Sequence, residues 1–205
     1  MPDTANRDWG NQTPSEELVA RVAEGDDYAF QILVNRHQTS VLNLIYRFMG
    51  DRSKSEDLAQ ETFLQAWRAA KSFQHKSKFT TWLYRICVNL CLNEIKSARR
   101  KKWLQFFQNA PGSRHPEAET QLDESPNPED LLLARERSQQ IANALQTLPE
   151  NQRIALILKR YDGLSYEEIS RVLGCSASAV ESLLVRAKRT LQKKLEIFLK
   201  KSAGF

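Results

Sequence analysis

The stretch 73-FQHKSKFTTWLYRICVNLCLNEIKSARRKK-102 decides the fold of this chain. It begins as a short polar loop headed by a lone aromatic residue and continues as one long helix. Apolar residues recur along that helix every three or four positions, at Leu83, Ile86, Cys87, Leu90 and Ile95. This spacing predicts a stripe that packs against other helices.

A second side of the same helix carries Trp82, Arg85 and Asn89, and five cations stand among the seven residues 96–102. An aromatic ring, a cation and an amide are the groups needed to stack on a base, hold a phosphate and read a base edge. The alternative is an amphipathic surface helix whose Trp82 is half in the core. The helix alone leaves both interpretations open.

Length and composition favour an all-helical chain of one domain or two small ones. The 205 residues include only 7 Gly and 7 Pro, and most of these stand where helices are expected to end. No apolar run approaches the roughly 18 residues that span a bilayer. The first 17 residues are polar and lack a secretory signal, so we expect a cytoplasmic protein without membrane insertion.

The residue types needed for catalysis or for cofactor binding are scattered. Cys87 and Cys91 lie one helical turn apart and could be two metal ligands, but burial as small apolar residues is the better interpretation. Three cysteines without a CxxC pair argue against a disulfide framework. There is no Gly-rich phosphate loop, and the three histidines are far apart in sequence. We therefore expect no catalytic residues, no metal and no cofactor.

Charge divides the chain into three parts. Residues 16–102 carry fifteen cations against ten anions, residues 103–130 carry one against six, and residues 131–205 carry thirteen against seven. Two basic lobes thus flank an acidic tether. This pattern predicts two separate contacts with a polyanion and a linker that avoids it.

Helix starts in the first lobe are predicted from short polar residues. Ser15-Glu16-Glu17 is expected to cap a helix over 18–24, and Ser53 with Glu56 is expected to form a capping box for a helix that ends near Lys71. The outward face of that helix carries Asp57, Gln60, Glu61 and Gln65. Such a face is usually only solvated, but a basic partner helix could also dock on it.

The second lobe predicts a helix-turn-helix. Ser165 and Glu168 form a capping box for a short helix over 166–173, and Gly174 makes the turn. Ser176 then caps a long basic helix. An ordinary helix hairpin is the alternative. The start of a recognition helix lies in the major groove, so its candidate base or phosphate contacts are Ser178, Glu181, Ser182, Val185 and Arg186.

Several motifs then coincide: SEDLAQETFLQAW at 55–67, SFQHKSKFTTWLYRICVN at 72–89, a Pro-rich acidic linker, and LPENQRIALILKRYDGLSYEEIS at 148–170 before the helix-turn-helix. In this order they resemble bacterial RNA polymerase sigma factors of the extracytoplasmic-function (ECF, group four) type. The resemblance implies an all-α fold with two small helical domains. These are sigma region 2 at 15–102 and region 4 at 129–201, joined by a flexible linker at 103–128.

The resemblance also implies partners and site residues. Asp57, Gln60 and Glu61 would contact the clamp helices of the polymerase β′ subunit, and the protein would also contact the β flap. The loop Phe73–Lys78 would line a pocket for a base flipped out of the promoter −10 element. The implied −10 set is Phe73, His75, Lys76, Lys78, Trp82, Arg85, Asn89, Lys96, Arg99 and Arg100. The implied −35 set is Ser165, Ser176, Ser178, Glu181, Ser182, Val185, Arg186 and Arg189.

Two further points follow from the resemblance. Such factors act in stress responses and are commonly held by an anti-sigma factor, which is therefore an expected partner beside core polymerase and promoter DNA. Many relatives have a cation where Glu181 stands, so the −35 sequence cannot be transferred from them.

A simple helix-turn-helix regulator and a module that binds polymerase without promoter activity remain the alternatives.

Overall fold

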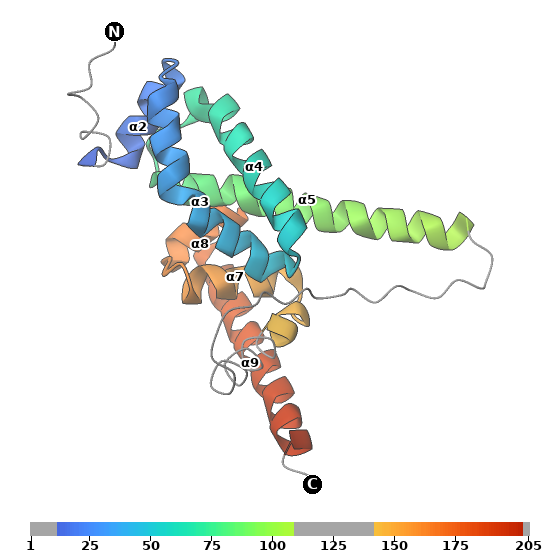
Figure 1. Cartoon of the computed structure of the whole chain (residues 1–205). Helices are drawn as coiled ribbons and strands as arrows, with labels where there is room; N and C mark the ends of the chain where they lie inside the picture. The colour runs from blue at the N-terminus through green and yellow to red at the C-terminus, as the bar shows by residue number, and fades with distance from the viewer. Residues whose placement is uncertain (1–11, 109–141, 203–205) are drawn as a thin grey trace, which may run out of the picture.

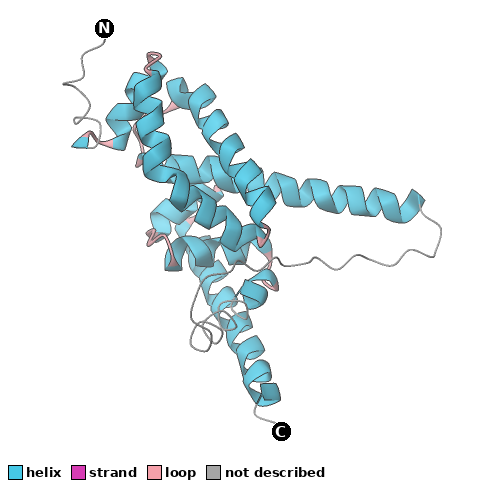
Figure 2. Cartoon of the chain, in the orientation of Figure 1, coloured by secondary structure: helices cyan, strands magenta, loops and turns pink. Residues whose placement is uncertain are grey.

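The computed structural model describes residues 12–108 and 142–202 of the chain. Within these ranges all regular structure is helical and no strand is present, as Figure 2 shows. The predicted all-α fold is therefore confirmed.

The N-terminal unit consists of α2 (Ser15–Ala23), α3 (Asp27–Met49), α4 (Arg52–Ala69), the 3-10 helix η2 (Ala70–Ser72) and α5 (Phe79–Gln108). Helix α3 packs against α2 and α4, and α4 packs against the first half of α5. Leu18, Leu44, Phe48 and Leu83 are completely or almost completely buried between these helices. The second half of α5 projects away from the body of the molecule (Figure 1).

The C-terminal unit consists of a short helix at 142–146 followed by α7 (Glu150–Arg160), α8 (Tyr166–Leu173) and α9 (Ala177–Ser202). Helices α7, α8 and α9 pack pairwise around Ile154, Leu158, Ile169 and Val180, none of which is accessible to solvent.

Local capping signals in this unit are confirmed. The Glu168 amide donates to the Ser165 hydroxyl at 3.1 Å, and the Ser165 amide donates to the Glu168 carboxylate at 2.9 Å. Gly174 ends α8 with a φ of 64°, a left-handed conformation that glycine adopts without strain. The Ser176 hydroxyl then accepts from the Ala179 amide at 3.2 Å. The predicted helix-turn-helix is thus present as α8, a glycine turn and α9.

Two caps predicted for the N-terminal unit are wrong. Helix α4 begins at Arg52, and Asp51 caps it by accepting from the Lys54 amide at 3.1 Å. The expected capping serine, Ser53, lies inside the helix because α3 already ends at Gly50, which leaves Asp51 as the first extended residue. Helix α2 likewise begins at Ser15 itself, after Pro14, without a side-chain cap.

Helix α5 is longer than the sequence predicts. It continues from Lys102 to Gln108, over residues that were assigned to the linker, because no glycine or proline interrupts it before Pro111. The remainder of the linker, 109–128, and the first part of the second domain, 129–141, lie outside the described residues.

The two units pack against each other and share one core. Helix α5 lies against α8, and α3 lies against α7 (Figure 1). Buried residues of both units, such as Phe48, Leu83, Ile157 and Ile169, belong to a single apolar cluster. We call this packing of the two units the closed arrangement.

Candidate functional site

The loop 73–78 joins η2 to α5 and folds back on an aromatic cluster formed by Phe73, His75, Phe79 and Trp82. The ring centroid of Phe73 lies 4.7 Å from that of His75 and 5.4 Å from that of Trp82. His75 has a φ of 55°, a left-handed conformation that is uncommon outside glycine. The loop turns at His75, and the ring contacts of Phe73 with His75 and Trp82 hold it against the start of α5.

A pocket of about 340 Å³ opens beside this loop. Its wall contains hydroxyl, amide, aromatic and cationic groups, from Ser72, Phe73, Gln74, Lys76, Ser77, Thr81, Trp82, Arg85 and Arg171. This volume lies within the usual range for sites of small molecules, and the groups are those that bind a flipped base and its phosphate. Most of the wall comes from the loop and the start of α5, but Arg171 belongs to α8 of the other unit. We call this cavity the base pocket, after the role that the sequence resemblance implies for the loop 73–78.

The residues that sequence spacing placed on one face of α5 differ in their exposure to solvent. Arg85 and Asn89 are exposed, whereas Trp82 is only 7 % exposed and Phe73 only 8 %. The start of α5 is buried on more than one side, because α3, α4 and α8 all pack against this helix. Trp82 therefore stands in the wall of the base pocket and does not present an open ring beside Arg85.

Two of the cations predicted to contact DNA are paired with acids of the C-terminal unit. Lys78 Nζ lies 2.9 Å from a carboxylate oxygen of Glu168, and Arg99 forms an ion pair with Glu150. The other predicted cations of this region, Lys76, Arg85, Lys96 and Arg100, are exposed.

Partly buried polar contacts also join the two units in the closed arrangement. The Tyr84 hydroxyl donates to Asp162 at 3.1 Å, and the amide of Gln146 donates to the carbonyl of Phe48 at 3.2 Å. Burial raises the pKa of the Asp162 carboxyl above its usual value. Hydrogen bonding to the Ser165 backbone, followed by the contact with Lys78, lowers the pKa of Glu168, so this carboxylate stays charged.

The N-terminal half of α9 carries a continuous exposed face. The residues predicted to contact the −35 element on this helix recur at positions 178, 181, 182, 185, 186 and 189, and all six are exposed. The opposite side packs inward through Val180 and Ala187, which are completely buried. The two serines that complete the predicted set, Ser165 and Ser176, cap α8 and α9.

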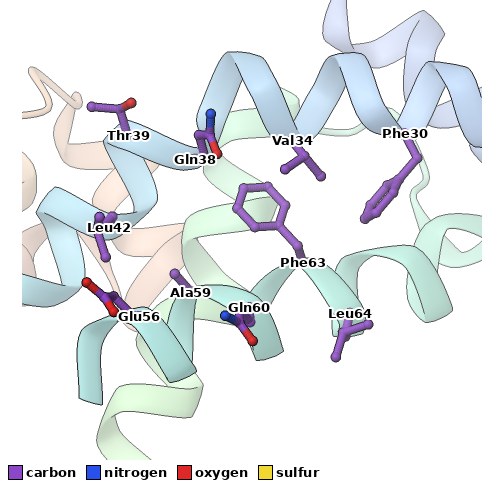
Figure 3. Close-up of a pocket in the computed structure, with 10 residues that line it drawn as sticks. All are labelled: Phe30, Val34, Gln38, Thr39, Leu42, Glu56, Ala59, Gln60, Phe63 and Leu64. Atoms are coloured by element: carbon purple, nitrogen blue, oxygen red, sulfur yellow. The ribbon is translucent and has the colours of Figure 1, made fainter. Parts of the chain in front are cut away.

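The predicted polymerase-docking residues lie on α4. Asp57 and Gln60 are exposed, and Glu61 is half-buried and accepts from the Gln65 side chain at 3.1 Å. This surface borders a groove of about 550 Å³ between α3 and α4, in which Phe30 and Val34 face Phe63 (Figure 3).

The apolar character of this surface was missed in the sequence. Leu64 is 48 % exposed and Trp67 is 43 % exposed, and both belong to α4. Their spacing of three residues beside the acidic face was the available signal. The docking surface therefore combines acidic, amide and apolar groups.

The buried cysteines are explained by packing. Cys87 and Cys91 are almost completely buried, as predicted for small apolar residues, and the hydrogen bond with Cys91, followed by burial, raises the pKa of Cys87. Among the described residues, no group of three or more His, Cys, Asp and Glu side chains could hold a metal ion. In the same ranges, no helix is long and apolar enough to cross a membrane.

Comparison with protein families matches both units separately. The family described as Sigma-70 region 2 matches residues 33–101, and the family described as Sigma-70, region 4 matches residues 138–191. The first match covers α4, the loop and most of α5, which a simple helix-turn-helix regulator would lack.

Curated relatives match over nearly the whole chain. The RNA polymerase sigma-H factor of Pseudomonas aeruginosa is 36 % identical over 191 residues, which cover 93 % of this chain and 98 % of the relative. The ECF RNA polymerase sigma-E factor of Escherichia coli K12 is 36 % identical over 192 residues with the same coverage.

Solved structures of similar fold include CnrH in complex with the cytosolic domain of CnrY, with a TM-score of 0.65 and 26 % identity over 89 % of this chain and 97 % of that one. They also include the sigma factor RpoE in complex with the anti-sigma factor NepR from Bartonella quintana, with a TM-score of 0.60 and 25 % identity over 82 % and 97 %. By its two family matches and its full-length relatives, this chain belongs to the ECF group of bacterial sigma-70 factors.

Proposed function

We propose that this sigma factor directs core RNA polymerase to two-part promoters by reading the −35 element with α9 and capturing the −10 strand at the base pocket, where it promotes melting. Sigma factors act in transcription initiation and are not themselves enzymes. The observation that carries the proposal is the pairing, in one chain, of an uncovered recognition-helix face with a base-sized pocket bordered by cations.

The −35 contact uses the exposed face of α9. A recognition helix places the residues of its first turns against base edges in the major groove. Arg186 and Arg189 can hold phosphates or guanines, while Glu181 can accept from the amino group of cytosine. Glu181 repels phosphate, so it favours a −35 sequence with a cytosine at the position that it faces.

The −10 contact uses the loop and the start of α5. Flipping a base out of the duplex costs a few kcal/mol. A protein that melts DNA has to offset this cost through contacts with the opened strand. Lys76 and Arg85 are exposed at the rim of the base pocket and can hold the strand's phosphates. Phe73 and Trp82 form the wall behind the base, and Asn89 lies further along the exposed side of α5.

The polymerase contact uses the acidic and amide side chains of α4. Asp57, Gln60 and Glu61 present carboxylate and amide oxygens to a basic helix such as those of the β′ clamp. The neighbouring groove between α3 and α4 adds apolar area beside these polar groups.

The closed arrangement has to open before the −10 strand enters. Arg171 of α8 borders the base pocket, and Lys78 and Arg99 are held by Glu168 and Glu150. A strand lying on α5 would compete with α8 for the same space and for the same cations. We therefore propose that polymerase binding separates the two units and that an anti-sigma factor, the kind of partner present in the similar RpoE complex, prevents this separation.

Reconstituted transcription tests the proposal. The promoters are first mapped from transcripts that appear after overexpression of the chain. Core polymerase supplied with this chain is expected to initiate on them and to make −10 thymines reactive to permanganate, whereas core polymerase alone does neither. Absence of initiation on every mapped promoter would contradict the proposal.

Charge reversal tests the docking surface separately. Asp57→Lys combined with Glu61→Lys is expected to weaken association with core polymerase while leaving the helical content unchanged. Glu17→Lys with Glu24→Lys, two exposed acids of the α2 segment, is the control with the same change in net charge. Equal association of both double variants would count against the docking surface on α4.

A further inference from the structure

Helix α5 begins after a residue whose side chain cannot cap it. The residue before its first helical position, Phe79, is Lys78, whose side chain has only donors and cannot accept from a backbone amide. The Phe79 amide instead donates to a carboxylate oxygen of Glu16 at 2.7 Å, across 63 positions of the sequence. The helix that leads out of the base pocket is therefore capped from α2.

Helix α2 is itself held firmly at its first turn. The Ser15 hydroxyl lies 3.0 Å from Nε2 of His37, and Arg36 donates to the Thr13 carbonyl at 2.9 Å and to the Ser15 hydroxyl at 3.0 Å. The ring of His37 lies 5.2 Å from that of Phe79. Glu16 thus projects from an anchored turn and is not a mobile surface side chain.

The other end of the loop also rests on α2, because η2, which precedes the loop, packs against this helix. Both attachments of the loop 73–78 are therefore made to the same element. Between them the loop contains His75 in a left-handed conformation, and its ring lies 4.7 Å from that of Phe73.

We propose that Glu16 is a positioning residue for the base pocket, because its carboxylate fixes where α5 begins. The inference rests on the proposed function of that pocket. If the cap is lost, the loop and the pocket residues Thr81, Trp82 and Arg85 shift together. Binding sites need their contacting groups held within about 0.5 Å, so both the rate of opening and the choice of base suffer.

Recognition of duplex DNA by α9 and docking on α4 do not depend on this cap. The hydrogen bond of Glu16 is made to the first residue of α5, and a carboxylate accepting from a helix N-terminus acts within the first turn of that helix. The proposal therefore predicts a defect confined to the −10 step.

The test uses Glu16→Ala in the reconstituted holoenzyme, compared with Glu16→Gln, which keeps an acceptor oxygen, and with Glu17→Ala, which removes the exposed neighbouring carboxylate. Permanganate reactivity on cognate and single-base −10 variants reports opening and base choice. A −35 duplex reports α9, and hydrogen exchange of the Phe79 amide reports the cap.

Glu16→Ala is expected to slow opening about tenfold, the value of one charge-assisted hydrogen bond, and to reduce discrimination among −10 bases. Phe79 exchange should accelerate, whereas −35 affinity should stay unchanged. Glu17→Ala should behave like the parent protein, and Glu16→Gln, which keeps the acceptor oxygen without the charge, should fall between the parent and Glu16→Ala. If the alanine variant unfolds, Glu16→Asp makes the same test, because the shorter side chain weakens the cap.

Opening at the parental rate, despite faster Phe79 exchange, would overturn the positioning role, and so would an unchanged exchange rate. Failure of the proposed function gives a different pattern. In that case Lys76→Ala and Arg85→Ala, which act on the pocket directly, would also open promoters at the parental rate.

Discussion

The two surfaces assigned to promoter DNA are built in opposite ways. The face on α9 comes from one helix that begins at its own cap, Ser176, and its six predicted contact residues are exposed. The wall of the base pocket is formed by a loop, by α5 and by α8, and the start of α5 is capped by Glu16. A surface made by one helix follows from local sequence, whereas a pocket made by several elements depends on the whole fold.

The difference extends to regulation. In the closed arrangement the predicted contact residues on α9 remain exposed, while Arg171 lines the base pocket and Lys78, at the end of the loop, is paired with Glu168. Separation of the two units should therefore affect strand capture more than recognition of duplex DNA.

A covalent link across the units gives the largest expected effect. Lys78→Cys with Glu168→Cys, in a Cys175→Ser background, can be joined by a short cleavable bismaleimide, since Cys87 and Cys91 are buried. Affinity for the −35 duplex should stay near the unlinked value, because the α9 face is exposed in the closed arrangement, whereas permanganate reactivity at −10 should fall toward the background of core polymerase alone. Cleavage of the linker should restore it. Linked protein that opens promoters normally would show that the closed arrangement does not hinder capture.

Truncation of the aromatic cluster gives the next largest effect. Phe79 is 2 % exposed and contacts the rings of His37, Phe73 and Trp82, so Phe79→Ala should lower the free energy of unfolding by about 3–5 kcal/mol. Val185→Ala on the exposed face of α9 should change it by less than about 0.5 kcal/mol. Urea unfolding followed by circular dichroism compares the two. Similar losses would mean that the surfaces do not differ in their dependence on the core.

Acid should weaken the N-terminal unit through His37. Burial and, after it, the neighbouring Arg36 cation lower the pKa of His37 from 6.5 to about 4. Between these values the unfolded chain binds a proton that the folded chain does not, so this contribution to stability is lost as pH falls from 6.5 toward 4, by at most about 1.4 kcal/mol per pH unit. His37→Gln should show a shallower decline over this range. Parallel curves for the two proteins would contradict the assignment.

Removal of one cation from α9 gives the smallest effect. Arg186→Ala should weaken binding to the −35 duplex by about 1–3 kcal/mol and reduce the salt slope by about one if the residue contacts phosphate. Arg160→Ala removes the same charge from α7 and serves as the control. Equal losses in both variants would indicate a general effect of net charge and would remove Arg186 from the contact set.

Sequence reasoning predicted the local features and missed the long-range ones. The box of Ser165 and Glu168 needs only neighbouring residues and was predicted correctly. The box expected at Ser53 failed because the left-handed Gly50 ends α3 early enough for Asp51 to cap α4. Even a local rule therefore depends on where the preceding helix ends.

Long-range contacts left weaker signals. The pocket beside Trp82 takes Arg171 from α8, more than eighty residues later in the chain, and the bond between Glu16 and Phe79 joins residues 63 positions apart. Helical periodicity reports one face of one helix and cannot show that a second unit covers another. Long-range pairing of this kind becomes visible only in the structure.

The central claim is that the two surfaces perform separate steps, and a paired measurement on one mapped promoter tests it most directly. Holoenzymes containing Arg85→Ala or Arg186→Ala are compared for affinity to the −35 duplex and for permanganate reactivity at −10. We expect Arg85→Ala to lose reactivity while keeping duplex affinity, and Arg186→Ala to lose duplex affinity while keeping reactivity once DNA is saturating. Variants that impair both steps to the same extent would contradict the claim.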